Sequence, residues 1–182
     1  MNSIKIAYIA MEHIKIIITI ILIMLALISD IRTYKIKNRL VGIFIIIGIA
    51  TNVGLQGKQG IGFSFIGIIS PVVILFLLYY LKMLGAGDIK LFSAIGAVMG
   101  VRFVVYAMAY SFLAGGIIAL FIMLMRKNVM IRFKYFVQYI KACILSGLLL
   151  PYSDLKNKGG NEKFPFAYGI FLGTVYTFLT FL

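Results

Sequence analysis

Long apolar stretches separated by short polar segments run through the whole chain. Several of them carry no charge and approach the roughly 20 residues that an α-helix needs to cross a bilayer. We predict six membrane-spanning helices, at Ile14–Ser29, Leu40–Leu55, Ile61–Leu81, Ile89–Gly100, Phe103–Met125 and Phe166–Leu182. The pattern therefore predicts an all-α integral membrane protein in which residues 1–182 form a single membrane-embedded domain.

Three parts of the chain depart from a simple series of spans. At ~1.5 Å per residue the fourth stretch covers only about two-thirds of a ~30 Å hydrocarbon core, so we expect a thinned membrane or a protein-lined cavity around its ends. Residues 126–165 form a long, mostly basic connection, in which the apolar run Ala142–Leu150 is too short to span. Residues 1–13 are of mixed polarity, and we expect them to lie in the membrane interface.

The composition supports a membrane protein and excludes several kinds of site. Hydrophobic residues make up 63% of the chain and charged residues 13%, and the mean hydropathy is +1.08. A soluble domain of this size could not bury so much apolar surface, so lipid must solvate part of it. The single cysteine (Cys143) and single histidine (His13) exclude a disulfide framework and leave no convincing metal site.

The net charge of +13 arises from 18 lysines and arginines against five acids. In a membrane protein such an excess indicates positively charged loops that face anionic lipid, and we predict no nucleic-acid partner. Fourteen of the basic residues flank or lie in the odd-numbered connections between the predicted spans. By the positive-inside rule these connections, including 126–165, are cytoplasmic, and both termini lie outside.

Two of the five acids stand apart from the others. Glu12, Asp154 and Glu162 lie in mixed or hydrophilic segments, whereas Asp30 ends the first span and Asp88 begins the fourth. Acids at membrane depth are costly, which makes a functional role the first hypothesis. The predicted topology places both carboxylates at the cytoplasmic edge of the bilayer. A purely structural alternative has two interfacial aspartates, with Asp88 acting as a helix N-cap.

The surroundings of these aspartates resemble the motifs of a known family. Gly85–Asp88, followed by Lys90, resembles the GxGD signature of aspartyl intramembrane proteases in the form seen in type IV prepilin peptidases. Asp30–Arg32 with Ile36–Asn38 resembles that family's first aspartate motif. Phe164–Phe166 and the glycines after it resemble the start of the family's final helix. The resemblance covers essentially the whole chain, in order and with the expected number of helices.

Two departures from the family pattern are informative. Lys37 stands where the first aspartate motif usually has proline, although the carboxylate itself is retained. The chain also lacks the two Cys-x-x-Cys pairs of members that also carry out N-methylation. It is therefore similar to the short forms associated with Flp/Tad-type pili, in which a methyltransferase is absent or separate. The resemblance implies a multi-pass protein of the bacterial cytoplasmic membrane.

The resemblance implies a membrane aspartic endopeptidase that cleaves the leader peptide of type IV, Flp-like prepilins at the cytoplasmic face. Asp30 and Asp88 would be the catalytic general acid/base pair, because two close carboxylates share a proton and can activate water without a metal or cofactor. The implied partners are a prepilin with a basic leader and an apolar helix, and anionic lipid. No oligomeric state is predicted.

Four further residues are predicted to support the pair. Gly85 and Gly87 would permit unusual backbone geometry and close approach to a substrate strand or to Asp88. Lys90 would raise the local positive potential or extend to lipid phosphates. Asn38 would form hydrogen bonds near Asp30.

Two other functions are compatible with the sequence. A related GxGD protease could cleave other membrane helices, although such members have tyrosine before the first aspartate, where this chain has Ser29. An ion- or proton-coupled transporter could use the two acids as a relay, although its acids would be expected nearer the middle of the membrane.

Overall fold

The computed structural model describes the backbone of residues 2–125 and 166–181, together with positions 130, 134, 137–139, 141 and 145; side chains are described from residue 12 onward. The predicted connection 126–165, with Cys143, Asp154 and Glu162, therefore lies almost entirely outside the described residues. All regular structure within the described residues is helical, which confirms the predicted all-α class.

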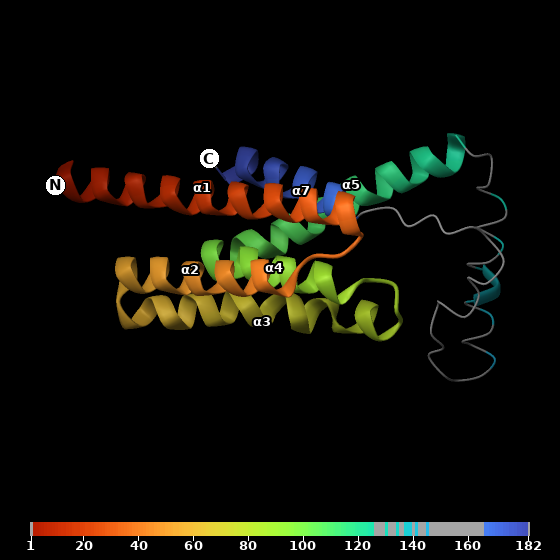
Figure 1. Ribbon diagram of the computed structural model, residues 1–182, viewed down its shortest axis with the longest axis horizontal. Helices are drawn as coiled ribbons and strands as arrows, with labels where there is room; N and C mark the ends of the chain where they lie inside the picture. The colour runs from red at the N-terminus through yellow and green to blue at the C-terminus, as the bar shows by residue number, and fades with distance from the viewer. Residues whose placement is uncertain are drawn as a thin grey trace.

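The described helices follow the predicted spans closely. They are α1 (Asn2–Thr33), α2 (Asn38–Gln56), α3 (Lys58–Tyr80), α4 (Ala86–Met99), α5 (Val101–Met125) and α7 (Ala167–Phe181). The largest difference is at the N-terminus, where residues expected to lie in the interface continue the first helix. Figure 1 shows α1 extending beyond the other helices at this end.

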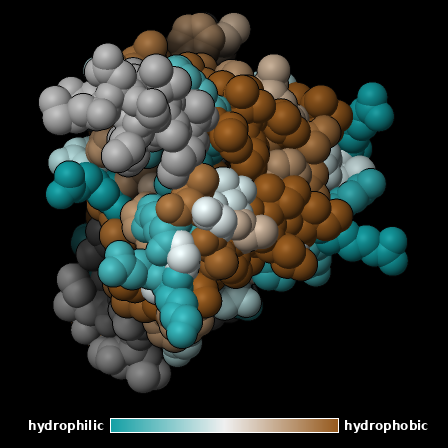
Figure 2. Space-filling model, turned by 90° about the vertical axis from the view of Figure 1, so that its left-hand side faces the viewer, coloured by the Kyte–Doolittle hydropathy of each residue, from teal (hydrophilic) through white to brown (hydrophobic). Residues whose placement is uncertain are grey.

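Within the part of the chain that the structure describes, four segments are long and apolar enough to cross a membrane: Glu12–Thr33, Asn38–Gln56, Lys58–Tyr80 and Val101–Met125. Most of their large hydrophobic side chains are exposed in the bundle, as expected for helices that face lipid. Figure 2 shows hydrophobic side chains over much of the end that carries the α2–α3 turn, with hydrophilic groups among them. The chain is thus a multi-pass membrane protein, while α4 and the described part of α7 are shorter than these four segments.

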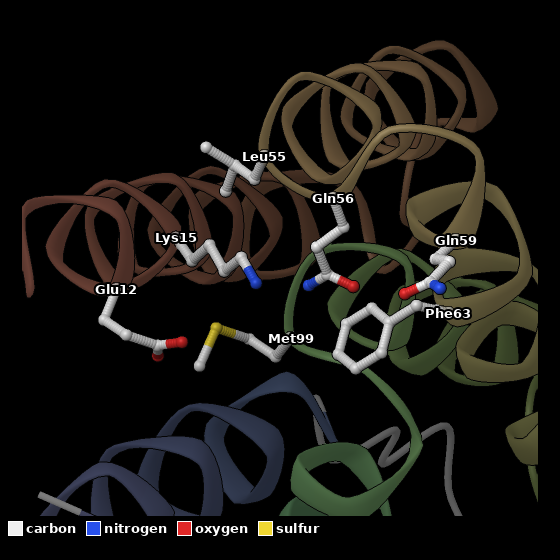
Figure 3. A pocket seen from close by; sticks show the side chains of 7 residues that line it. All are labelled: Glu12, Lys15, Leu55, Gln56, Gln59, Phe63 and Met99. Atoms are coloured by element: carbon white, nitrogen blue, oxygen red, sulfur yellow. The ribbon is translucent and has the colours of Figure 1, made fainter. Parts of the chain in front are cut away.

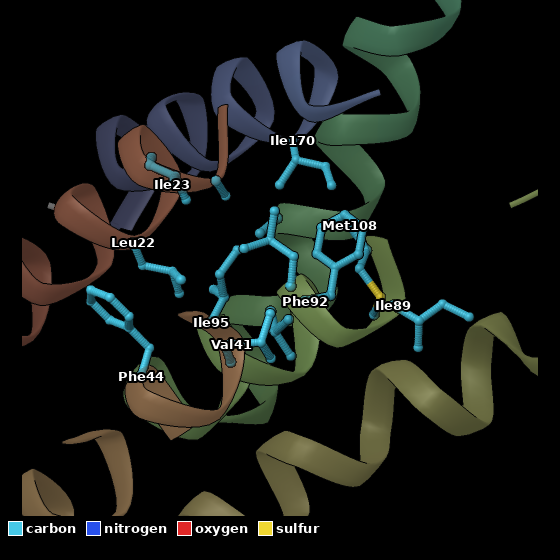
Figure 4. Packing of buried hydrophobic residues seen from close by; sticks show 14 of the residues in the cluster. Leu22, Ile23, Val41, Phe44, Ile89, Phe92, Ile95, Met108 and Ile170 are labelled. Carbon is cyan, nitrogen blue, oxygen red and sulfur yellow. The ribbon is translucent and has the colours of Figure 1, made fainter. Parts of the chain in front are cut away.

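Helix α4 lies at the centre of the bundle, in contact with α1, α2, α3 and α5 (Figure 1). Every residue from Leu91 to Val98 is buried. A helix that is apolar on all sides can be stable when protein surrounds it, which explains how so short a helix is accommodated. Its side chains join those of the other helices in one hydrophobic core, which includes Leu22, Phe92 and Ile170 (Figure 4).

Small residues allow the helices around α4 to approach closely. A Cβ atom on Gly67 of α3 would collide with the backbone carbonyl of Gly96 on α4, and the reverse substitution would collide in the same way. Gly173 of α7 lies equally close to Ser111 of α5. Close packing of this kind stabilises helix pairs in a membrane, because the hydrophobic effect does not drive helices together in lipid.

A buried polar cluster fixes the C-terminal half of α4 to its neighbours. The side-chain amide of Asn52 on α2 donates to the carbonyl oxygens of Ala97 (2.9 Å) and Val98 (3.1 Å) and to Ser64 Oγ on α3 (3.0 Å). Ser64 Oγ in turn donates to the carbonyl oxygen of Ala97 at 2.9 Å. These bonds fix the position of α4, and therefore of Asp88 at its start.

Candidate active site

Asp30 lies in the last turn of α1, and only 8% of its surface is exposed. Hydroxyl groups at this end of α1 form hydrogen bonds with the segment that follows the helix. Ser29 Oγ and Thr33 Oγ1 both donate to the carbonyl oxygen of Lys35, at 2.9 and 3.0 Å. The connection that leads to α2 is therefore folded against the helix end that carries the carboxylate.

Asp88 is the third residue of α4, and Gly85 is the N-cap of that helix. The Asp88 carboxylate accepts a hydrogen bond from the backbone N–H of Gly85, and the Asp88 N–H donates to the Gly85 carbonyl oxygen at 3.2 Å. This is one half of a capping box, in which the third residue satisfies the N–H of the N-cap. The alternative in which Asp88 is itself the N-cap is therefore wrong.

The fold brings the two carboxylates close enough for their charges to interact. Asp88 lies outside the four segments long enough to span the membrane. Burial, and then the negative charge of Asp30, raise the pKa of Asp88 to about 6, against a partial opposing effect of the Gly85 hydrogen bond. Like charges held close together in a desolvated site favour a shared proton. The pair can therefore hold one proton at mildly acidic pH, up to about pH 6.

The two glycines of the GxGD segment leave room for neighbouring side chains, and their backbone conformations are ordinary. Gly85 has φ −76° and ψ 145°, which any residue adopts, and Gly87 lies inside α4 without a positive φ. The predicted need for special backbone geometry is therefore wrong. A Cβ atom on Gly85 would lie 3.1 Å from Asp88 Oδ2, so the predicted close approach to Asp88 is present.

Gly87 connects the two aspartate motifs. A Cβ atom at this position would lie 3.4 Å from Cβ of Ile36, in the connection that follows Asp30. This is ordinary van der Waals contact, so the space around Gly87 is less restricted than that around Gly85. The GxGD segment and the first aspartate motif therefore pack directly against each other.

Lys90 and Asn38 form a second link between these motifs. Lys90 Nζ donates a hydrogen bond of 3.0 Å to Asn38 Oδ1 at the start of α2. The partner of Asn38 is thus Lys90, whereas the sequence suggested a role for Asn38 beside Asp30. The lysine is exposed, and this bond links the first residue of α2 to the fifth residue of α4.

Sequence reasoning missed one contact of Asp30. The backbone N–H of Ala167, at the start of α7, donates to Asp30 Oδ2 at 3.4 Å. The last helix thus directs its positive N-terminal end at the carboxylate. The motif Phe164–Phe166, which immediately precedes Ala167, was the signal that could have located this contact. Phe166 contacts the ring of Phe112 on α5, with centroids 5.5 Å apart, and so helps to place the start of α7.

Comparison with known proteins identifies the family of the chain. The model of the type IV leader peptidase family matches residues 16–120, a range that contains both Asp30 and Asp88. No curated protein and no solved structure gives a match. Because the family model covers more than half of the chain, the chain belongs to the type IV leader peptidase family.

Proposed function

We propose that this protein is a membrane aspartic endopeptidase that cleaves the leader peptide of type IV, Flp-like prepilins, with Asp30 and Asp88 as its general acid and base. One observation carries the proposal: two aspartates that are 58 positions apart in the chain lie close enough that burial, together with the negative charge of Asp30, raises the pKa of Asp88 to about 6. Their motifs also pack together through Gly87 and Ile36.

The proposed reaction uses one shared proton. The ionised carboxylate takes a proton from a water molecule as the water oxygen attacks the scissile carbonyl carbon, and the protonated carboxyl donates to the carbonyl oxygen. The resulting tetrahedral gem-diol collapses as the C–N bond breaks. The leaving nitrogen takes the proton from the carboxyl that had accepted it from water, and a gem-diol hydroxyl gives a proton to the other carboxylate, so the pair is again singly protonated. No covalent intermediate is required.

The position of the pair suits a substrate that is partly in the membrane. Asp30 lies in the last turn of a spanning segment, and Asp88 lies just before the apolar part of α4. A prepilin presents its scissile bond between a basic leader and an apolar helix, at the edge of the bilayer. On the positive-inside argument this edge is cytoplasmic and both termini lie outside. The resemblance to type IV prepilin peptidases implies that the membrane is the bacterial cytoplasmic membrane.

The proposal is tested by cleavage with purified protein in lipid. The substrates are an Flp-type prepilin, the same prepilin with its basic leader residues replaced by serine, and an unrelated single membrane helix. We expect mass spectrometry to show cleavage of the intact prepilin alone, at the leader junction, and no cleavage by the Asp30→Asn variant.

Two results would contradict the proposal and indicate a different function. Equal cleavage of the unrelated helix would indicate a GxGD protease of broad specificity. No cleavage of any substrate, together with proton flux in sealed vesicles that depends on Asp30, would indicate a transporter.

A further inference from the structure

A cavity of about 400 Å³ lies at the end of the bundle opposite to Asp30 and Asp88. Its lining comes from α1, the α2–α3 turn region and the end of α4. The residues that line it are Glu12, Lys15, Leu55, Gln56, Gln59, Phe63 and Met99 (Figure 3). None of them belongs to the candidate active site.

Lys15 is the unusual residue of this cavity. Its side chain is only 5% exposed, and Figure 3 shows its ammonium group directed into the space between α1 and the α2–α3 turn. The ring of Phe63 lies 5.2 Å from Nζ and provides a cation–π contact. Among the described residues it has no hydrogen-bond acceptor or ion-pair partner. A buried ammonium with unused donors is costly, so the cavity favours a ligand that supplies a hydrogen-bond acceptor.

Other polar groups converge on the same space. The amides of Gln56 and Gln59 come from either side of the α2–α3 turn and point toward the cavity (Figure 3). Glu12 lines it one turn before Lys15 on α1, and the two opposite charges attract each other although the described side chains are not within ion-pair distance. The cavity thus offers one cation, one anion and two amides, a set that complements a ligand carrying both charges.

The depth of the cavity indicates a lipid as the source of that ligand. Lys15 precedes Asp30 by fifteen residues of the same helix, which is roughly 22 Å along the axis. With Asp30 at one edge of a hydrocarbon core of ~30 Å, Lys15 lies close to the opposite edge. Headgroups of that leaflet can reach it, and the apolar side chains of Leu55, Phe63 and Met99 can contact the start of an acyl chain.

We propose that this cavity binds the headgroup of a zwitterionic phospholipid from the leaflet opposite to the active site. The phosphate accepts hydrogen bonds from Lys15 and from the amides of Gln56 and Gln59, and the headgroup ammonium lies beside Glu12. The proposal depends on membrane embedding and is independent of the peptidase function.

The test measures lipid binding to the full-length protein by native mass spectrometry in detergent. The probes are dihexanoyl phosphatidylethanolamine, dihexanoyl phosphatidylglycerol and inorganic phosphate. We expect the wild type to prefer the ethanolamine lipid, and Lys15→Met to bind it at least about tenfold more weakly, since charge-assisted hydrogen bonds to phosphate are lost. Glu12→Gln should remove the preference for ethanolamine over glycerol. Lys58→Met, which removes an exposed lysine in the same turn outside the cavity lining, should bind within about twofold of the wild type.

Several results would overturn the proposal. Equal binding by Lys15→Met and the wild type would show that the ammonium does not hold the lipid. Inorganic phosphate binding as tightly as the lipid would indicate a site for free anions, and a preference for the glycerol lipid would exclude a zwitterionic ligand. Should Lys15→Met fail to fold, Gln59→Leu serves in its place: weaker binding with an unchanged melting curve supports the site, and unchanged binding contradicts it.

Discussion

Replacing Asp88 by asparagine should abolish peptidase activity and, at the same time, stabilise the fold at alkaline pH. Asparagine nearly preserves the shape of the side chain, and its carbonyl oxygen can still accept the hydrogen bond from the Gly85 N–H. It removes the negative charge that burial and Asp30 disfavour. Activity and stability should therefore change in opposite directions, which is unusual for a buried polar substitution.

The size of the effect follows from the pKa of Asp88. A shift from 3.8 to about 6 corresponds to at most about 3 kcal/mol, since one pKa unit is worth about 1.4 kcal/mol. Because the folded pKa is raised, the folded protein keeps a proton that the unfolded chain releases at lower pH. The destabilisation of the wild type is thus absent below pH 3.8, grows between pH 3.8 and about 6, and is complete above about pH 6.

The assay is thermal unfolding of wild type and Asp88→Asn in the same detergent, at about pH 4 and about pH 8. The variant should melt at a higher temperature at the alkaline pH, and the two proteins should melt at similar temperatures at the acidic pH. A variant that melts lower at alkaline pH, or a difference that does not depend on pH, would refute the argument that burial and Asp30 disfavour the ionised form of Asp88.

Three further predictions concern the geometry, the proton and the topology. Gly85→Ala should lower kcat about tenfold, because its Cβ atom displaces the Asp88 carboxylate, while Gly87→Ala should stay within about threefold of the wild type in the same cleavage assay. The value of kcat/KM should fall about tenfold per pH unit above about pH 6, because Asp88 then loses the shared proton; a flat alkaline profile would contradict this role. Lys58→Cys in a Cys143→Ser background should react with a membrane-impermeant thiol reagent in intact cells, and labelling only in inverted vesicles would reverse the predicted orientation.

The sequence was sufficient to locate the helices and the two aspartates. Uncharged runs give a strong signal because lipid excludes charge, and Asp30 and Asp88 stand out against such runs. One round trip across the membrane, through the second and third stretches, places the end of the first stretch and the start of the fourth at the same side. That inference needs only the number of helices between the two residues, so it does not depend on details of side-chain packing.

Contacts between distant segments could not be predicted in this way. The hydrogen bond from Ala167 to Asp30 joins residues that are 137 positions apart, and it depends on where α5 holds α7. The central position of α4 could not be settled from the sequence, because its short apolar stretch was compatible with either a thinned membrane or protein around its ends. The burial of Lys15 could not be predicted either, because it depends on how α1 packs beside the α2–α3 turn.

The glycines of the GxGD segment show a third kind of limit. A glycine in a sequence pattern shows that a side chain is absent. It does not show whether the position needs an unusual backbone conformation or room for a neighbouring atom. At Gly85 the backbone is ordinary, and the close atom is Asp88 Oδ2. Only the three-dimensional structure distinguishes these two reasons for a glycine at position 85.

The central claim, that Asp30 and Asp88 form the catalytic pair, is tested most directly by the single-turnover rate of prepilin cleavage by purified variants in lipid. Asp30→Asn and Asp88→Asn should each lose at least about 10²-fold in rate while remaining folded. Asp154→Asn, which lies in the predicted hydrophilic connection, should cleave at close to the wild-type rate. Cleavage by either the Asp30 or the Asp88 variant at a rate near that of the wild type would contradict the account.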